Sequence, residues 1–348
     1  MKRVSNYYKS FYQKPKNTII QINKMPNRKN IFFTLFFLLN VLLFAQQYPF
    51  MTQYRGHLYY FNPAFAGTKR WIDIRAFYRQ QWTGFEGSPS TSAISFNIRY
   101  FKGKLGSGCM IYSDKIGPFQ TSYFSGNSAV HIKMADTELS FGFSVAYTML
   151  KLNPSLITLR HQIDAAVDLN NPALTKNKLE GTLGVLYYND RFFLSLSMLQ
   201  LFGATYKYTY SNPNFYKGEY TNENQIMFGA GYNFGENPDY VFENTFWVMS
   251  GKAMPLFLDY SLRLHIHKTL IVGGSIRPGN AFAFHAGLNI LNKFQITYSY
   301  DLLVSKLRTA QKGTHEINLV YSIDKKYTSK SGGVDKRFLK QKYQYLLN

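Results

Sequence analysis

Phe294-Gln295-Ile296-Thr297-Tyr298-Ser299-Tyr300-Asp301 alternates apolar and polar side chains without a fault. Residues 256–267 behave in the same way. One face carries Leu256, Leu258, Tyr260, Leu262, Leu264 and Ile266, and the other carries Phe257, Asp259, Ser261, Arg263, His265 and His267. A period of two over this length indicates a β-strand with one apolar and one polar face, and helical spacing does not fit it.

Fourteen segments share this pattern and are predicted to be strands: 71–79, 92–100, 104–114, 121–133, 137–150, 178–189, 191–199, 223–235, 240–251, 256–267, 269–277, 280–291, 293–302 and 314–323. Many of them are longer than the ~5–6 residues of typical soluble strands. They approach the ~9–11 residues that a tilted membrane-spanning strand needs. Their length therefore favours strands that cross a membrane.

The connections between these segments differ in length on alternate sides. Those after odd-numbered strands are mostly long, as at 80–91, 151–177, 200–222 and 303–313, whereas those after even-numbered strands are tight. Tight turns at one end and long loops at the other are typical of outer-membrane barrels with periplasmic termini. We predict an all-β fold: an antiparallel transmembrane β-barrel of about 14 strands in the outer membrane, with periplasmic N- and C-termini.

Composition agrees with this fold class. No segment after residue 45 approaches the ~18 apolar residues of a spanning helix, so a polytopic helical membrane protein is excluded. The chain is 18% aromatic and only 17% charged, which is typical of a β-rich protein. Aromatic residues near predicted strand ends, such as Tyr78, Tyr188 and Trp247, suit the girdles at the two membrane interfaces.

The net charge of +21 lies mainly at the two ends of the chain. Residues 1–45 contribute 8 − 0 = +8 and residues 325–348 contribute 7 − 1 = +6, which leaves 21 − 14 = +7 for the body. A nucleic-acid-binding protein concentrates basic charge on a folded surface, and the body shows no such stripe. We therefore expect no nucleic-acid partner.

The N-terminus has the order of a secretory signal. Arg28 and Lys29 precede an apolar run, Ile31 to Phe44, and Ala45 follows as a small residue at the cleavage position. This run is short for a membrane anchor. The predicted division is a signal peptide over 1–45 (with Met25 as an alternative start), a periplasmic N-terminal segment over 46–70, the outer-membrane β-barrel over 71–323 and a basic periplasmic tail over 324–348.

No catalytic, cofactor-binding or metal-binding residue is predicted. The single cysteine forms no internal disulfide. His265 and His267 lie two residues apart on one strand face and could share an ion, but no carboxylate or third histidine is near them in sequence. Both are therefore predicted to line the lumen. No nucleophile elbow, phosphate loop or His-Glu-x-x-His motif occurs. We expect no enzyme, although a hydrolase with residues scattered along the chain stays an alternative.

Several stretches are more specific than a general barrel pattern: Pro49-Phe50-Met51-Thr52-Gln53-Tyr54, Asn62-Pro63-Ala64-Phe65-Ala66-Gly67, the run Arg79 to Thr91 (RQQWTGFEGSPST), Asp114 to Pro118 (DKIGP), and His315 to Tyr321 (HEINLVY). In this order they resemble the PorP/SprF family of Bacteroidetes outer-membrane proteins over roughly residues 47–323. The resemblance implies a β-barrel component of the type IX secretion system. It also implies as partners outer-membrane lipid, other secretion components and large secreted surface proteins with C-terminal sorting domains, such as the adhesins of gliding motility.

Two functions follow as hypotheses. In the first, the barrel binds or anchors exported surface proteins, the secretion machinery, or both, with loops 151–177 and 200–222 facing the exported protein. In the alternative, the barrel is a diffusion channel or a transporter of small hydrophobic substrates, and 151–177 folds inward to constrict it. The sequence leaves both open.

Candidate partner-binding residues lie in the first long loop: Arg79, Gln81, Trp82 and Phe85. Loops on a rigid scaffold often carry recognition residues. The same residues also have a structural interpretation, in which glycines and a proline shape the loop so that its aromatic side chains pack against the barrel wall.

Overall fold

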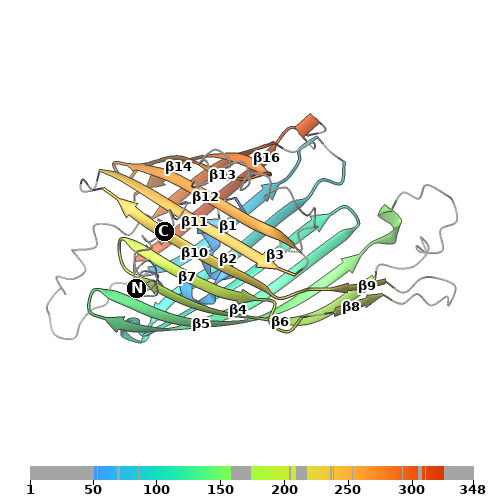
Figure 1. Ribbon diagram of the computed structural model, residues 1–348, viewed down its shortest axis with the longest axis horizontal. Coiled ribbons are helices and arrows are strands. Elements are labelled where there is room, and N and C mark those ends of the chain that lie inside the picture. Colours follow the sequence, from blue (N-terminus) through green and yellow to red (C-terminus); the bar gives the residue numbers. More distant parts are fainter. Residues whose placement is uncertain are drawn as a thin grey trace, which may run out of the picture. The chain divides into compact units, whose positions relative to one another are not determined.

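The computed structural model describes residues 51–324, except for 53, 69–70, 85, 158–173, 204, 209–217, 236, 238, 253, 292, 305–307 and 310. The predicted signal peptide and, apart from Asp324, the predicted basic tail lie outside the described residues. Within them, fourteen antiparallel strands form a closed barrel (Figure 1). None of the helices in the described part is long and apolar enough to cross a membrane.

The barrel strands are β1 (Trp71–Gln80), β2 (Ser90–Tyr100), β3 (Leu105–Ile116), β4 (Phe119–Met134), β5 (Thr137–Leu152), β6 (Leu174–Tyr188), β7 (Phe192–Leu199), β10 (Gln225–Phe234), β11 (Tyr240–Gly251), β12 (Met254–Ile266), β13 (Leu270–Arg277), β14 (Ala281–Ile290), β15 (Phe294–Leu303) and β16 (Thr314–Asp324). Each overlaps one of the fourteen predicted strands, so the predicted fold class is confirmed. Two short strands were not predicted: β8 (Thr205–Tyr208) pairs with β9 (Gly218–Thr221) in a separate hairpin within 200–222.

The two ends of the barrel differ as expected. Trp71 pairs with Asp324, so the first strand begins and the last strand ends at the same end, which we call the terminal end. All connections at this end are short, such as 101–104 and 135–136. The opposite end, which we call the loop end, carries the long connections 81–89, 153–173, 200–224 and 304–313.

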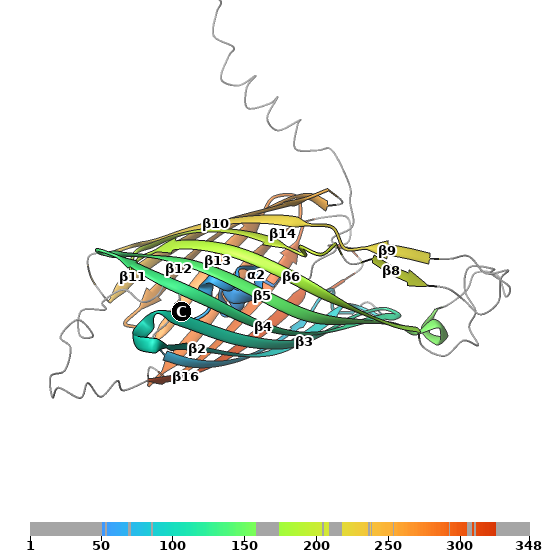
Figure 2. The same ribbon diagram turned by 90° about the horizontal axis from the view of Figure 1, so that it is seen from below.

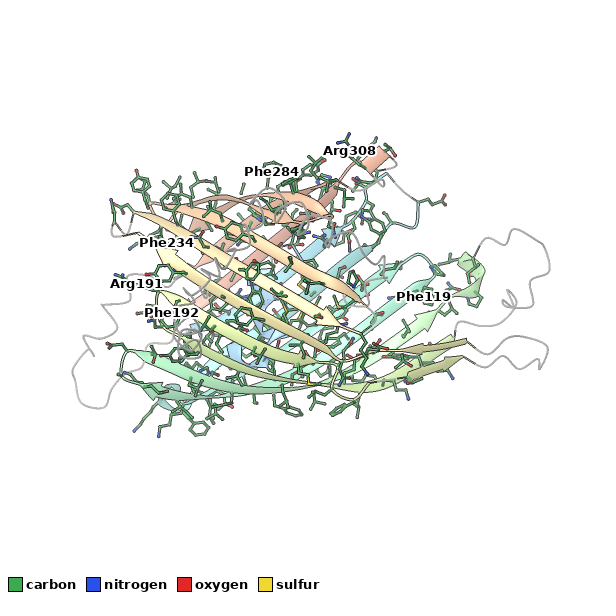
Figure 3. All side chains as sticks on the ribbon, viewed as in Figure 1. Phe119, Arg191, Phe192, Phe234, Phe284 and Arg308 are labelled. Carbon is green, nitrogen blue, oxygen red and sulfur yellow. The ribbon has the colours of Figure 1, made fainter. Side chains whose placement is uncertain are left out.

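Burial alternates along the strands with apolar side chains outward. In β2, Ile94 and Phe96 are exposed, while Ser95 and Asn97 are buried against the lumen. The two faces predicted for 256–267 are confirmed along β12. Figure 3 shows Phe284 on the outer surface of the barrel, where it is 61% exposed. An apolar outside around a polar inside suits a barrel surrounded by lipid, because lipid does not penalise exposed apolar surface.

Two aromatic residues assigned to an interfacial girdle face the lumen instead. Trp247 is 0% exposed and Tyr188 is 4% exposed. Tyr78 keeps an outward position and is 51% exposed. The assignment of Trp247 and Tyr188 was wrong because strand phase, and not residue type, decides which face a side chain occupies.

Replacing Phe284 with arginine tests the lipid-facing surface. We expect Phe284→Arg to lower the stability of the inserted barrel by about 2–4 kcal/mol, because a charge near the middle of a lipid-facing strand loses its hydration. The measurement is denaturant unfolding in phospholipid bilayers. The same change at Phe101, which is 69% exposed in a terminal-end turn, serves as the control and should cost no more than about 1 kcal/mol. Equal losses of stability for Phe284→Arg and Phe101→Arg would contradict the assignment of Phe284 to the lipid-facing surface.

The described part of the N-terminal segment lies inside the barrel, as Figure 2 shows. It contains η1 (Tyr54–His57), α2 (Leu58–Phe61) and η2 (Pro63–Phe65), and we call residues 51–68 the lumenal segment. The sequence predicts a periplasmic segment over 46–70, ahead of the first barrel strand. The structure differs because the aromatic residues of α2 find apolar partners on the lumenal wall, a match that no local pattern reveals.

Two further short helices lie in connections. They are η3 (Phe101–Gly103) at the terminal end and η4 (Pro154–Leu156) at the loop end. The inward folding considered for 151–177 falls on residues 158–173, which are outside the described residues.

Candidate functional site: a closed lumen

The lumenal segment runs from the loop end to the terminal end. Thr52 contacts Asp301 and Glu316, which lie near the loop ends of β15 and β16. The backbone N–H of Gly67 donates to Asn97 Oδ1 (2.8 Å), near the terminal end of β2. The segment thus crosses the lumen before β1 begins.

Three glycines let the segment approach the wall closely. A Cβ atom added at Gly142 of β5 would overlap the backbone of Ala64. One added at Gly106 of β3 would overlap Ala66, and one added at Gly184 of β6 would overlap the Asn62 side chain. These lumen-facing positions therefore need a residue without a side chain as long as the segment is seated.

One side chain and two backbone carbonyls of the wall bind the asparagine of the segment. Asn62 Nδ2 donates to Ser195 Oγ (2.8 Å) and to the carbonyls of Val185 (3.0 Å) and Leu196 (3.2 Å). Its Oδ1 accepts from the N–H of Ala64 (2.9 Å), which caps η2. Both polar atoms of the Asn62 side chain, Oδ1 and Nδ2, thus form hydrogen bonds.

Two further carbonyls of the segment are bound by side chains of the wall. Ser140 Oγ donates to the carbonyl of Ala64 (2.8 Å). His131 Nε2 contacts the carbonyl of Ala66 at 2.8 Å, with the ring nitrogen as the donor because a carbonyl only accepts. A helix this short leaves most of its backbone groups without internal partners, so these contacts replace water.

Aromatic side chains of the lumenal segment pack against aromatic side chains of the wall. Tyr60 meets Tyr112 and Tyr123 edge to face, with ring centroids 5.5 Å apart in each pair. Phe65 packs against Phe193 at 5.5 Å in the same geometry. Trp247 lies 5.4 Å from Tyr54 and 6.4 Å from Phe65 between centroids. Such pairs contribute roughly 0.5–1.5 kcal/mol each beyond the area they bury.

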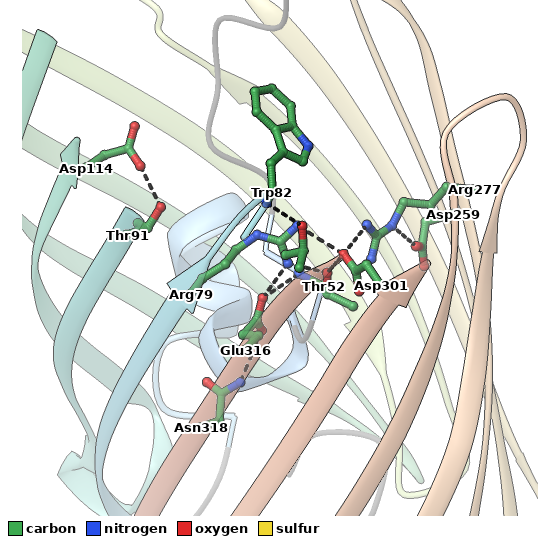
Figure 4. A network of polar contacts seen from close by, with 11 residues as sticks. Thr52, Arg79, Trp82, Thr91, Asp114, Asp259, Arg277, Asp301, Glu316 and Asn318 are labelled. Atoms are coloured by element: carbon green, nitrogen blue, oxygen red, sulfur yellow. Dashed lines mark hydrogen bonds and ion pairs between the residues drawn. The ribbon is translucent and has the colours of Figure 1, made fainter. Parts of the chain in front are cut away.

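A charged network lies on the lumenal side of the wall near the loop end (Figure 4). Arg79 of β1 donates to Glu316 Oε2 (2.8 Å) and to Asp301 Oδ2 (3.0 Å), and it also contacts the Thr52 hydroxyl. Thr52 donates from its N–H to Glu316 (2.9 Å) and from its hydroxyl to Asp301 (2.6 Å).

The network continues along the wall. Arg277 donates to Asp301 Oδ2 (3.0 Å) and to Asp259 Oδ2 (2.9 Å), so it links β13 to β15 and β12. All of these side chains are buried. Buried ion pairs of this kind offset the loss of hydration only while each charge keeps its partners.

The candidate partner-binding residues are not equivalent in the structure. Arg79 is 5% exposed and serves the network described above. Gln81 and Trp82 are half-buried at the loop end, where the N–H of Gln81 donates to the Pro89 carbonyl (2.8 Å). The N–H of Trp82 donates to Thr314 Oγ1 (3.2 Å), and Figure 4 shows its indole beside the network. Phe85 lies outside the described residues.

A second polar cluster lies at the terminal end. Arg99 pairs with Glu138 (2.5 Å between Nη2 and Oε2), and the Tyr188 hydroxyl donates to the same carboxylate (2.7 Å). The Tyr188 hydroxyl also lies 3.1 Å from His131 Nδ1. Because His131 binds the Ala66 carbonyl, this cluster holds the end of the lumenal segment.

The two histidines considered for metal binding are separated. His265 is buried and its Nε2 lies 2.9 Å from Glu243 Oε2 of the neighbouring strand. His267 lies in the exposed turn that follows β12, so its predicted place in the lumen was wrong: the strand ends at Ile266. In the part of the chain that the structure describes, no group of three or more His, Cys, Asp or Glu could hold a metal ion.

Lowering the pH should loosen the lumenal segment through His57. Burial lowers the pKa of His57 to about 3, and the nearby Arg75 acts in the same direction, whereas the nearby Asn318 side chain acts against them. A released His57 regains an ordinary pKa of about 6.5. Release therefore takes up a proton between these values, so seating is unaffected above pH ~6.5 and weakens as the pH falls below it.

The measurement is protease cleavage of the lumenal segment in the folded barrel between pH 7.5 and 4.5. Cleavage should increase as the pH falls, and a His57→Gln variant should respond less. If the cleavage rate rises equally in the unaltered chain and in His57→Gln, the pH dependence arises from titratable groups other than His57.

Fold and site together define a class: an outer-membrane β-barrel whose lumen is occupied by its own N-terminal segment. A family model described as "Type IX secretion system membrane protein PorP/SprF" matches residues 43–321. The chain belongs to this family and is an outer-membrane β-barrel component of type IX secretion. Membership implies association with other secretion components.

Solved structures resemble the chain in fold. The Acinetobacter baumannii outer membrane protein Omp33 is 11% identical, with 74% of this chain and 99% of that chain covered and a TM-score of 0.42. The Ralstonia pickettii toluene transporter TbuX is 10% identical, with 75% and 92% covered and a TM-score of 0.46. At these values the likeness says nothing about function. No curated protein matches the chain in sequence.

Proposed function

We propose that this barrel is a non-enzymatic binding component of type IX secretion, which engages exported surface proteins at its loop end and the secretion machinery at its terminal end. The observation that carries the proposal is the lumenal segment, which lies inside the barrel and is held at both ends by polar clusters. Because the segment occupies the lumen, binding of proteins at the loop end and the terminal end is favoured over passage of solutes through the barrel.

The loop end offers the larger recognition surface. Strands β4 and β5 have 16 residues each and β6 has 15, whereas β7 has 8, so one side of the wall extends beyond the rest. Exposed apolar side chains lie on this extension, including Ile116, Phe119 and Leu156. Figure 3 shows Phe119 near its tip. Exposed apolar groups beyond the membrane suit a protein partner of the kind exported by this system.

Gln81, Trp82 and Phe85 stay part of the proposal as contacts of the exported protein. Arg79 would support them indirectly, because its guanidinium holds the base of the loop to the network. The basic tail, 324–348, is proposed to lie in the periplasm and to contact the machinery.

Affinity purification from the native outer membrane tests the proposal. A C-terminally tagged full chain should bring down large surface proteins and other secretion components, identified by mass spectrometry. Trp82→Ala combined with Phe119→Ser should lose the surface proteins and keep the machinery. The matched control at the terminal end, Phe101→Ser, should keep the surface proteins. Recovery of the barrel alone would contradict the proposal.

A further inference from the structure

The lumenal segment is held as a bound peptide rather than as a strand of the sheet. In the described part of the chain, it makes no ladder with any barrel strand. Its polar contacts come from side chains on several strands, such as Asn97, Ser140 and Ser195. This is how a protein recognises the backbone of an extended ligand without adding it to a sheet.

The wall beneath residues 62–67 consists of small residues in register. Gly106 pairs with Ala129, Ala129 with Gly142, Gly142 with Gly184, and Gly184 with Ser197. The row crosses five adjacent strands, from β3 to β7. It forms a groove that takes up the Asn62 side chain and the backbone of Ala64 and Ala66.

One polar group of this row is unused by the seated segment. Ser197 is 2% exposed, and within the described residues its hydroxyl has no hydrogen-bond partner. It adjoins Ser195, which binds Asn62, on the same lumenal face of β7. The Ser197 hydroxyl therefore keeps a hydrogen-bonding capacity that the seated segment does not use.

We propose that the lumenal wall of β3–β7 is a peptide-binding site for an extended segment with an asparagine followed by small residues, of the form Asn-Pro-Ala-Phe-Ala-Gly. The chain's own residues 62–67 occupy the site in cis. A second peptide of the same sequence occupies it once that segment is released. The site is distinct from the rims that the proposed function uses.

Asn62 supplies the specificity. Its amide uses Ser195 and two backbone carbonyls of the wall, and its oxygen caps η2. A shorter or apolar side chain gives up these contacts and leaves the buried Ser195 hydroxyl without Asn62 as its partner, which disfavours such a side chain. Pro63 suits the site as well, since it fixes the backbone at the first position of η2 and has no N–H to satisfy.

The test uses full-length chains and a fluorescent peptide of residues 57–68, with binding followed by anisotropy. Two chains vacate the groove: Asn62→Ala, and a chain whose residues 62–67 are replaced by a Gly-Ser repeat of equal length. Both should bind the peptide at least ~10-fold more tightly than the unaltered chain, because cis occupancy lowers apparent affinity by the fraction of free sites.

Two matched substitutions test whether the peptide binds in the groove or elsewhere on the barrel. Gly142→Ala in the Gly-Ser chain should abolish peptide binding, because the added Cβ occupies the place of Ala64. Gly126→Ala on the outer face of the adjacent strand should leave binding unchanged, because within the described residues its Cβ meets no atom within 4 Å. A peptide with alanine at the Asn62 position should not bind.

Heat-modifiable migration on gels verifies that every variant is a folded barrel. Failure of the folded Gly-Ser chain to bind the peptide would overturn the proposal. So would equal binding to the Gly142→Ala and Gly126→Ala chains, because binding would then occur away from the groove.

Discussion

Replacement of Arg79 by methionine is expected to lower the free energy of unfolding by about 3–5 kcal/mol, which is the usual cost of removing one partner of a buried ion pair. The guanidinium neutralises Asp301 and Glu316 at once and also binds Thr52. Asp301 keeps Arg277 in the variant. Glu316 loses the ion pair that it shares with Arg79 while it stays buried, so most of the loss should arise there.

Part of the lost free energy of unfolding should be recovered when the negative charge of Glu316 is also removed. Arg79→Met combined with Glu316→Gln should be more stable than Arg79→Met alone when both are unfolded by denaturant in the same lipid. The control is Arg308→Met, since Arg308 is exposed at the loop end, as Figure 3 shows, and should change stability by less than about 0.5 kcal/mol. Equal losses for Arg79→Met and Arg308→Met would show that the network contributes nothing.

Deletion of residues 51–67 is expected to turn a closed barrel into a conducting one. Closed barrels of about 8 strands are filled by their own side chains, whereas those of 16–18 strands leave an aqueous channel. The present fourteen strands lie between these sizes, and here the lumenal segment supplies the filling. In planar bilayers we expect the deletion to raise single-channel conductance at least ~10-fold above that of the unaltered chain.

The open lumen should prefer cations weakly. Among the described residues, five buried arginines line it against seven buried carboxylates, which gives 5 − 7 = −2: Arg75, Arg79, Arg99, Arg263 and Arg277 against Asp73, Asp114, Glu180, Glu243, Asp259, Asp301 and Glu316. The reversal potential in a salt gradient measures this preference. A chain in which residues 51–67 are kept but scrambled provides the control. A deletion variant that stays closed would show that the wall or the loops seal the lumen without the segment.

The strand pattern was accessible from sequence because it is a local property. A side chain's face follows from its parity along the strand, so Asp259 and Arg263 could be assigned to the lumen before any contact was known. The segregation of long and short connections likewise followed from counting residues between strands. The β8–β9 hairpin escaped prediction because each of its strands has only four residues, too few to show a period.

The candidate site was accessible only in part. Arg79 was singled out for the motif in which it lies, but the partners that decide its role are 222 and 237 positions away in the chain. Barrel closure brings them together, because β1 pairs with β16. The carboxylate beside His265 was hidden from the sequence for a similar reason, since Glu243 lies on the neighbouring strand. The lumen-facing parity of Gly106, Gly142 and Gly184 was the available signal for the groove.

Alternation, strand length and connection length thus determined the barrel, the face that each strand turns to lipid and the sidedness of its loops. The tertiary structure alone decided that residues 51–68 fill the lumen. The physical reason is that this segment has no periodicity of its own to match. Its place depends on the fit of Asn62, Ala64 and Phe65 to glycines, aromatic rings and hydrogen-bonding groups that lie on several strands and meet only when the sheet closes.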